Sequence, residues 1–163
     1  MSSITDLRGL FLHTLKDMYY AEKQHQKALG SLADKASDDT LTQQLRQHAE
    51  HGDQRIERLE KVFDLVGEKA EGVPCDAMDG ILKEAKKLAD EATEADTRDA
   101  ALIMACQAAC HYGITRYGTL ATFATQLGMG EAADHLGQSL SAHEDADQKL
   151  TRLAEDGLNA EAV

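Results

Sequence analysis

A carboxylate and an imidazole, Glu22 and His25, stand three residues apart on an otherwise apolar stripe. Residues three apart share one face of a helix, so one helix can present two ligands to a metal centre. A buried carboxylate is too costly without compensation, which a metal ion or another charge must supply. The spacing alone is weak evidence for a metal site, because this pair of residue types is common by chance.

Two further imidazoles follow at His48 and His51, and His48 lies on the apolar stripe of its own segment. If the chain turns near residues 36 and 37, antiparallel partners sum to about 73. Glu22 then faces the level of His51, and His25 faces that of His48. We therefore expect three histidines and one carboxylate at one level.

The last segment repeats the pattern, because Glu144 and Asp147 interrupt its apolar stripe. With a turn near residue 129, partners sum to about 258, which brings Cys110 and His111 level with Asp147. Mixed oxygen and imidazole ligands favour iron, manganese or zinc. The alternative interpretation is surface charges beside a hydrogen-bonded core histidine.

The cysteines are Cys75, Cys106 and Cys110, an odd number without metal-knuckle spacing, which is typical of a reducing cytoplasm. Cys106 and Cys110 share a helix face, which admits a soft-metal or redox role. Small buried hydrophobes are the commoner use of such thiols.

Helices must position these residues, since the chain has one proline and little of the alternation of a strand. Apolar spacings of three and four predict helices over 4–33, 40–66, 76–93, 97–127 and 131–156. The long helices form two antiparallel hairpins, and 76–93 has the length of a crossover. We predict an all-α, ferritin-like four-helix bundle, with 1–163 as one domain.

Charge limits the partners, because 17 Lys and Arg against 29 Asp and Glu give a net charge of −12 in 163 residues. Nucleic acid and anionic membranes are therefore excluded as expected partners. No export signal or long apolar window is present, so we expect a cytoplasmic protein.

The chain resembles the YciE/YciF-type ferritin-like stress-protein family over nearly its whole length. The resemblance is carried by residues 10–12 and 15–24, His48 with 58–63, 75–80, 99–103 with Gln107, 111–112, 117–119, and Glu144 with Asp147. It implies a bacterial stress-response protein of largely unsettled function, with a carboxylate/histidine metal site in the bundle and a tendency to form homodimers.

By this resemblance, Glu22 is the first-helix ligand, His48 is a second-helix ligand, and Glu144 and Asp147 are the opposing acids. His51 stands where the family usually has an acid.

Other positions depart from the family pattern. Cys110 and Gly113 replace two acids, and His25 replaces an apolar residue. Either the site is rebuilt around histidine, with Cys110 or His111 as the ligand from that helix, or it has lost one of two metals.

Two main hypotheses remain. The first is a stress protein that binds iron or manganese, with zinc as a further candidate, and that reacts with O₂ or peroxide. The second is a non-catalytic homodimeric scaffold whose polar core residues satisfy one another without metal. An iron-storage cage is disfavoured, because nothing in the sequence specifies a large shell.

Overall fold

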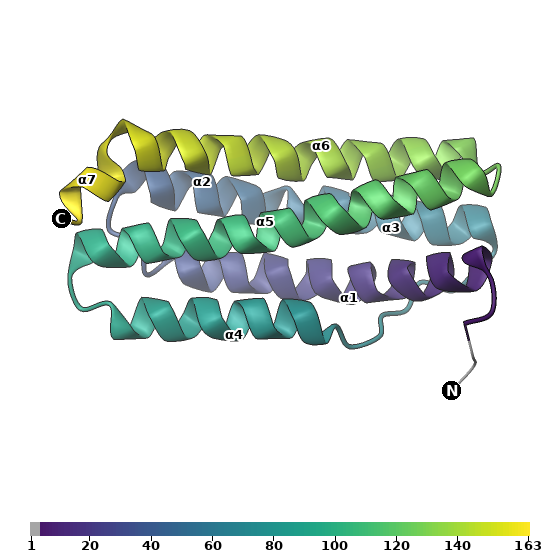
Figure 1. The fold of residues 1–163 in the computed structure, drawn as a ribbon, viewed down its shortest axis with the longest axis horizontal. Coiled ribbons are helices and arrows are strands. Elements are labelled where there is room, and N and C mark those ends of the chain that lie inside the picture. Colours follow the sequence, from purple (N-terminus) through teal and green to yellow (C-terminus); the bar gives the residue numbers. More distant parts are fainter. Residues whose placement is uncertain (1–3) are drawn as a thin grey trace.

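The computed structural model describes residues 4–163 and shows an elongated bundle of helices (Figure 1). The helices are α1 (Leu7–Ala33), α2 (Asp39–Glu50), α3 (Gly52–Val66), α4 (Asp76–Glu91), α5 (Ala95–Gln126) and α6 (Gly130–Leu153). A π-helical turn, η1 (Ala154–Leu158), and the short α7 (Asn159–Glu161) follow. No strand occurs between residues 4 and 163, so the predicted all-α class is confirmed.

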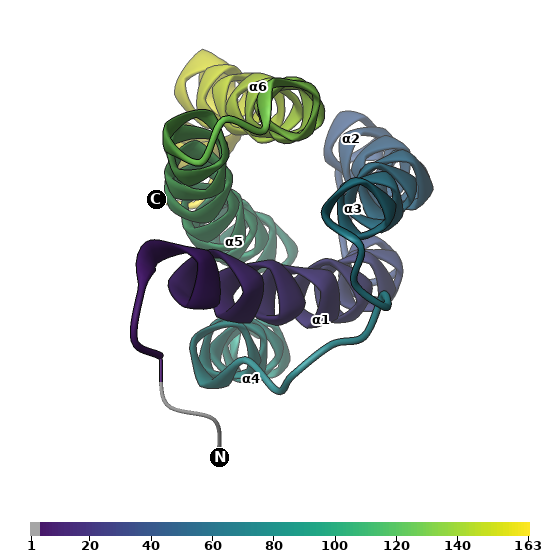
Figure 2. The same ribbon diagram turned by 90° about the vertical axis from the view of Figure 1, so that its right-hand side faces the viewer.

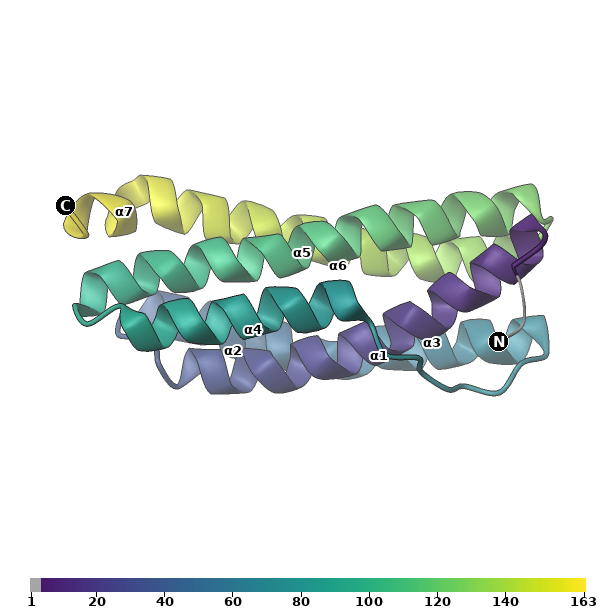
Figure 3. The ribbon, with the colours of Figure 1, turned by 60° about the horizontal axis from the view of Figure 1, so that its bottom comes forward.

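Four helical columns surround the core: α1, α2 continued by α3, α5, and α6. Figure 2 looks along the bundle and shows α4 outside these columns, beside α1. It contacts both α1 and α5, as a crossover between the two hairpins must (Figure 3). The arrangement is the predicted ferritin-like one.

The predicted helix 40–66 is interrupted at His51, which is a correction to the sequence analysis. Gly52 follows the break and is buried against α1, where an added Cβ would lie 2.7 Å from Cγ of Gln26. The close approach of the two helices at this glycine accompanies the break. It also leaves His51 exposed at the junction.

The helix ends follow local capping chemistry. Asp6 and Asp38 accept hydrogen bonds from the backbone at the starts of α1 and α2, and Gly67 ends α3 in the left-handed conformation. Asp99 is buried on α5 and accepts bonds from the Ser37 and Asp38 backbone N–H groups at 2.8 and 2.7 Å. This carboxylate therefore ties the second hairpin to the turn of the first.

Two apolar clusters fill the core. The first includes Phe11, Leu15, Phe63, Leu120 and Leu136. The second includes Leu29, Leu41, Leu45, Leu102 and Leu150. Each buried Leu or Phe contributes about 1.5–3 kcal/mol relative to exposure. This burial offsets the cost of the polar side chains that are also buried in the bundle.

None of the helices formed by residues 4–163 combines the length and apolar composition needed to cross a membrane.

Candidate metal site

Glu22 of α1 and Arg55 of α3 form an ion pair in the bundle interior. Arg55 Nε donates to both carboxylate oxygens of Glu22, at 3.2 and 3.1 Å, and the two side chains are 1% and 0% exposed. Burial alone would raise the pKa of Glu22, but the Arg55 guanidinium and then His143 hold it well below its usual value. Glu22 is therefore ionised, and Arg55 is its counter-charge.

Two more side chains bind the same carboxylate oxygen. Nε2 of His143, on α6, lies 2.7 Å from Oε1 of Glu22, and the Tyr117 hydroxyl on α5 donates to it at 2.9 Å. A carboxylate only accepts, so Nε2 of His143 carries the hydrogen, and Nδ1 is the ring nitrogen left to bind a ligand. Burial and the Glu22 charge raise the pKa of Tyr117 well above its usual value, which keeps the phenol protonated.

His25 and His48 complete a group of three imidazoles with His143. One ligand nitrogen from each ring lies within 4.8 Å of the other two. Burial lowers the pKa of His25 to about 3 and that of His48 well below its usual value. Both rings are therefore neutral at pH 7, the form that can bind a metal.

Three ring nitrogens of this group lack a hydrogen-bond partner among the described residues. They are both nitrogens of His25 and Nδ1 of His143. Buried polar atoms are nearly always hydrogen-bonded, so orphans gathered in one place indicate a ligand. His48 differs, because its Nδ1 lies 3.5 Å from Arg55 and its Nε2 lies 3.8 Å from Sγ of Cys110.

The thiols near the cluster are protonated. Burial raises the pKa of Cys106 to about 12 and also raises that of Cys110. Only the thiolate is a strong metal ligand. Cys110 therefore lies beside the imidazoles as a neutral neighbour.

Glu22, His25, His48 and Cys110 are thus brought together, whereas four other predicted residues lie elsewhere. Glu144 and His51 are exposed. His111 is 64% exposed and lies 3.1 Å from Asp147 at the bundle surface, where Gln107 also donates to Asp147.

The expectation that Glu144 points into the bundle is wrong, because the buried stripe of α6 contains Leu136, Ser139, His143 and Leu150. One residue rotates a helix by about 100°, so burying His143 turns Glu144 outward. His51 is exposed at the junction of α2 and α3, so it does not join the group around Glu22.

Sequence reasoning missed Arg55 and His143. Arg55 lies on the stripe that contains His48, so its position signalled burial, but an arginine is rarely expected there without a partner. His143 immediately precedes Glu144 and could have been found by shifting the α6 stripe by one residue.

Gly113 explains how His143 fits. A Cβ at this position would lie 2.8 Å from three ring atoms of His143, so only glycine leaves room for the imidazole. The His143 ring on α6 therefore fills the space that a side chain at position 113 of α5 would occupy. This favours a site rebuilt around histidine.

The donor set distinguishes two kinds of metal centre. A dinuclear carboxylate centre does not fit, because among residues 4–163 only Glu22 brings a carboxylate to the cluster, and it is paired with Arg55. A mononuclear centre fits better, since His25 and His143 hold unpartnered ring nitrogens and a ring nitrogen of His48 lies within 4.8 Å of one from each.

Comparison with known proteins gives consistent results. Residues 6–163 match a family described as a domain of unknown function, DUF892. The chain is 40% identical to Protein YciF of Escherichia coli K12 over 157 residues, covering 96% of this chain and 95% of that protein.

Solved structures agree with this match. "The crystal structure of the E. coli stress protein YciF" aligns with a TM-score of 0.91 and 39% identity, covering 95% of this chain and 98% of that chain. A chain described as "YcfI, a putative structural protein" from Rhodopseudomonas palustris aligns with a TM-score of 0.90 and 40% identity, covering 91% and 95%. With full-length similarity in both sequence and fold, this chain belongs to the YciF-like DUF892 family.

Proposed function

We propose that this chain is a stress-response protein of the YciF-like family that holds one transition-metal ion between His25, His48 and His143. The observation that carries the proposal is the gathering of three unpartnered ring nitrogens in a buried group of imidazoles. The description of the Escherichia coli relative as a stress protein supports the biological setting.

Iron or zinc suits this donor set best. Imidazole nitrogens bind both ions well, whereas manganese prefers carboxylate oxygens, and here Glu22 is occupied by Arg55. An iron ion with an open coordination position would supply redox chemistry toward O₂ or peroxide.

The surrounding side chains have defined tasks in this proposal. Glu22 accepts the Nε2 hydrogen of His143 and thereby directs its Nδ1 lone pair toward the ligand position. Arg55 neutralises Glu22, so the buried charge that remains is that of the metal ion.

Metal titration of chelator-treated protein tests the proposal. Fe²⁺, added without oxygen, and Zn²⁺ are titrated separately, with the bound metal measured by elemental analysis. We expect one ion per chain. At a free metal concentration of 100 times Kd, the folded state gains about 2.7 kcal/mol, which raises the unfolding temperature.

His25→Leu is the decisive variant, because neither ring nitrogen of His25 bonds to the described protein. Loss of even an outer partner of a ligand costs about 10–100-fold in affinity, so losing a ligand should cost at least about 100-fold. His111→Leu is the matched control, since it removes the same ring from the surface and should bind as wild type does. Failure of wild type to take up either ion, or equal uptake by His25→Leu, would overturn the proposal.

A second candidate function is a metal-free structural bundle. The observation in its favour is the Glu22–Arg55 pair, because the guanidinium already supplies the positive charge that a metal would bring. The description of the Rhodopseudomonas relative as a putative structural protein agrees with this candidate. It predicts no metal uptake and an unfolding temperature that chelator leaves unchanged.

A further inference from the structure

The three imidazoles of the histidine cluster differ in how they meet solvent. His25 and His143 are each 1% exposed, whereas His48 is 8% exposed. A metal site inside a protein needs an entry path. The His48 side is therefore the side from which an ion or a small molecule can reach the cluster.

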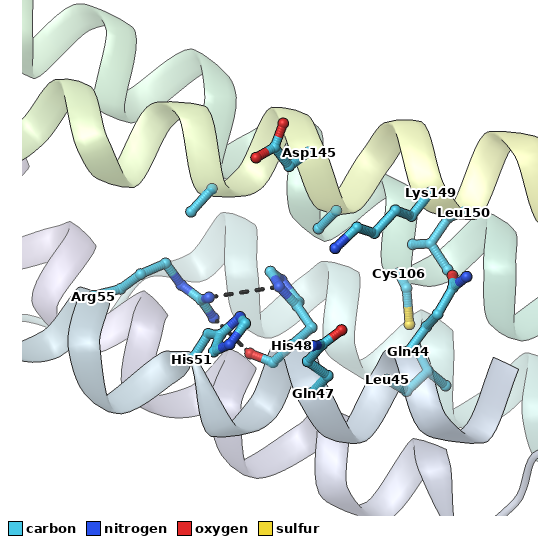
Figure 4. A pocket seen from close by; sticks show the side chains of 12 residues that line it. Gln44, Leu45, Gln47, His48, His51, Arg55, Cys106, Asp145, Lys149 and Leu150 are labelled. Atoms are coloured by element: carbon cyan, nitrogen blue, oxygen red, sulfur yellow. Dashed lines mark hydrogen bonds between the residues drawn. The ribbon is translucent and has the colours of Figure 1, made fainter. Parts of the chain in front are cut away.

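A cavity of about 150 Å³ meets His48 on this side, between α2, α3 and α6. We call it the α2–α6 pocket. Figure 4 looks into it and shows His48 and Arg55 on α2 and α3, with Lys149 extending from α6. The pocket is lined by Gln44, Leu45, Gln47, His48, His51, Arg55, Cys106, Ala142, Asp145, Ala146, Lys149 and Leu150.

This pocket joins solvent to the bundle interior. Its lining includes the exposed residues Gln47, His51 and Asp145, and also the buried residues Arg55 and Cys106. Its volume is enough for several water molecules, since one water needs about 10–15 Å³ of such space. Small solutes therefore have room to pass from the surface to His48.

Two alanines of α6 leave this space open. Ala142 and Ala146 both line the pocket, and their spacing of four residues places them on one face of the helix. A methyl side chain extends little beyond the helix surface. A larger aliphatic side chain at either position would extend into the cavity and fill it.

The charges along the pocket are balanced. Glu22 neutralises Arg55 at the inner end, and Asp145 offsets Lys149 among the exposed residues of the lining. Such a lining neither concentrates anions nor repels cations. Passage through it therefore depends on the size of the solute more than on its charge.

We propose that the α2–α6 pocket is the route by which metal ions and small uncharged molecules, of the size of O₂ or hydrogen peroxide, reach the histidine cluster. Ala142 and Ala146 keep this route open. The delivery of metal rests on the function proposed above, whereas the passage itself exists in the metal-free protein and is tested there separately.

Cys106 reports on the passage without metal. Cys106 and Cys110 lie one turn apart on α5 and are 2% and 0% exposed, but of these two thiols only Cys106 lines the pocket. Chelator-treated protein is labelled with methyl methanethiosulfonate, a small thiol reagent, and each cysteine is followed by mass spectrometry. Ala146→Leu should slow labelling of Cys106 about tenfold, because the leucine must move aside, and should leave the rate at Cys110 unchanged.

The kinetics of Zn²⁺ uptake test whether the same route serves the cluster. Stopped-flow mixing of chelator-treated protein with Zn²⁺ and an indicator dye gives the rates of uptake and release. Ala146→Leu should slow both about tenfold, since the leucine obstructs passage in either direction. The Kd should stay nearly unchanged, because the leucine does not contact the bound ion. Loss of a ligand would instead weaken the affinity.

Two further variants complete the design. Ala142→Leu fills the pocket from the preceding turn of α6 and should slow both reactions, which keeps the test valid if Ala146→Leu does not fold. Ala133→Leu is the matched control, because it adds the same bulk to a half-buried position of α6 that does not line the pocket. It should label and take up Zn²⁺ at the wild-type rates.

The outcomes separate this route from the metal site. Wild-type rates of Cys106 labelling and of Zn²⁺ uptake in both pocket variants would overturn the route, and so would equal slowing by Ala133→Leu. If the wild type binds no metal but the pocket variants still protect Cys106, the proposed metal function fails and the passage to the cluster stands.

Discussion

Two polar networks connect the helices of this bundle, one in its interior and one nearer its surface, and they differ in how completely their atoms are paired. In the outer network, the Tyr112 hydroxyl donates to Asp17 at 2.6 Å, accepts from Arg116 at 3.1 Å and lies 3.0 Å from Sγ of Cys75. It joins α1, α5 and the start of α4. The histidine cluster joins α1, α2, α3, α5 and α6 but leaves three ring nitrogens without partners.

The difference separates a structural network from a candidate site. Polar groups that satisfy one another fix the positions of helices and leave nothing for a ligand. Unpartnered buried atoms cost free energy in the folded protein, and a ligand that binds them recovers it. We therefore assign a structural role to the Tyr112 network, and the comparison predicts different responses to substitution.

The largest expected effect on the free energy of unfolding is that of Glu22→Gln. This change leaves the fully buried Arg55 without its counter-charge. Removing one partner of a buried pair costs about 3–5 kcal/mol of unfolding free energy, measured by urea denaturation. Glu22→Leu with Arg55→Met is the control, because replacing both charges by apolar groups should recover most of the loss. A cost below about 1 kcal/mol for Glu22→Gln would contradict the assigned ion pair.

Acid should destabilise the metal-free protein through the histidine cluster. Burial lowers the folded-state pKa of His25 to about 3, so below an unfolded pKa of about 6.5 the unfolded chain binds the proton that the folded chain excludes. Stability contributed by the neutral ring is therefore present above pH 6.5 and is lost as the pH falls. The expected slope is about 1.4 kcal/mol per pH unit from His25 between pH 6 and 4.5.

Urea denaturation of wild type and His25→Leu at pH 7, 6 and 5 measures this slope. The variant should lose the His25 share of the acid sensitivity and keep that of His48, whose pKa is lowered by the same cause, burial. His111→Leu is the control and should follow the wild-type curve. Identical curves for wild type and His25→Leu would show that His25 is not held neutral.

A smaller effect is expected for Tyr112→Phe in the outer network. Loss of its hydroxyl removes the partner shared by Asp17, Arg116 and Cys75. Because Asp17 and Arg116 are only partly buried, the cost is about 1–2 kcal/mol by urea denaturation. Tyr20→Phe removes an exposed bond to Asp79 and should leave the free energy of unfolding nearly unchanged. Metal uptake should be unchanged in both variants. Loss of uptake in Tyr112→Phe would remove the distinction between the two networks.

The sequence by itself determined the all-α class, the two hairpins with their crossover, and the burial of Glu22, His25 and His48. These features depend on the 3.6-residue period of apolar side chains, which is local information. Counting residues away from the turn also predicted that His25 and His48 lie at the same level of the bundle. In the structure their ring centroids lie 5.2 Å apart.

Only the tertiary structure decided which groups meet Glu22. Its ion pair with Arg55 crosses between helices, and the rotation of α6 that buries His143 depends on the space left by Gly113 on α5. The break at His51 likewise lies where Gly52 packs against α1. The rotation of a helix and the partners of its side chains depend on how neighbouring helices pack against each other. The apolar pattern within one helix leaves its rotation uncertain by about one residue, so it does not predict these contacts.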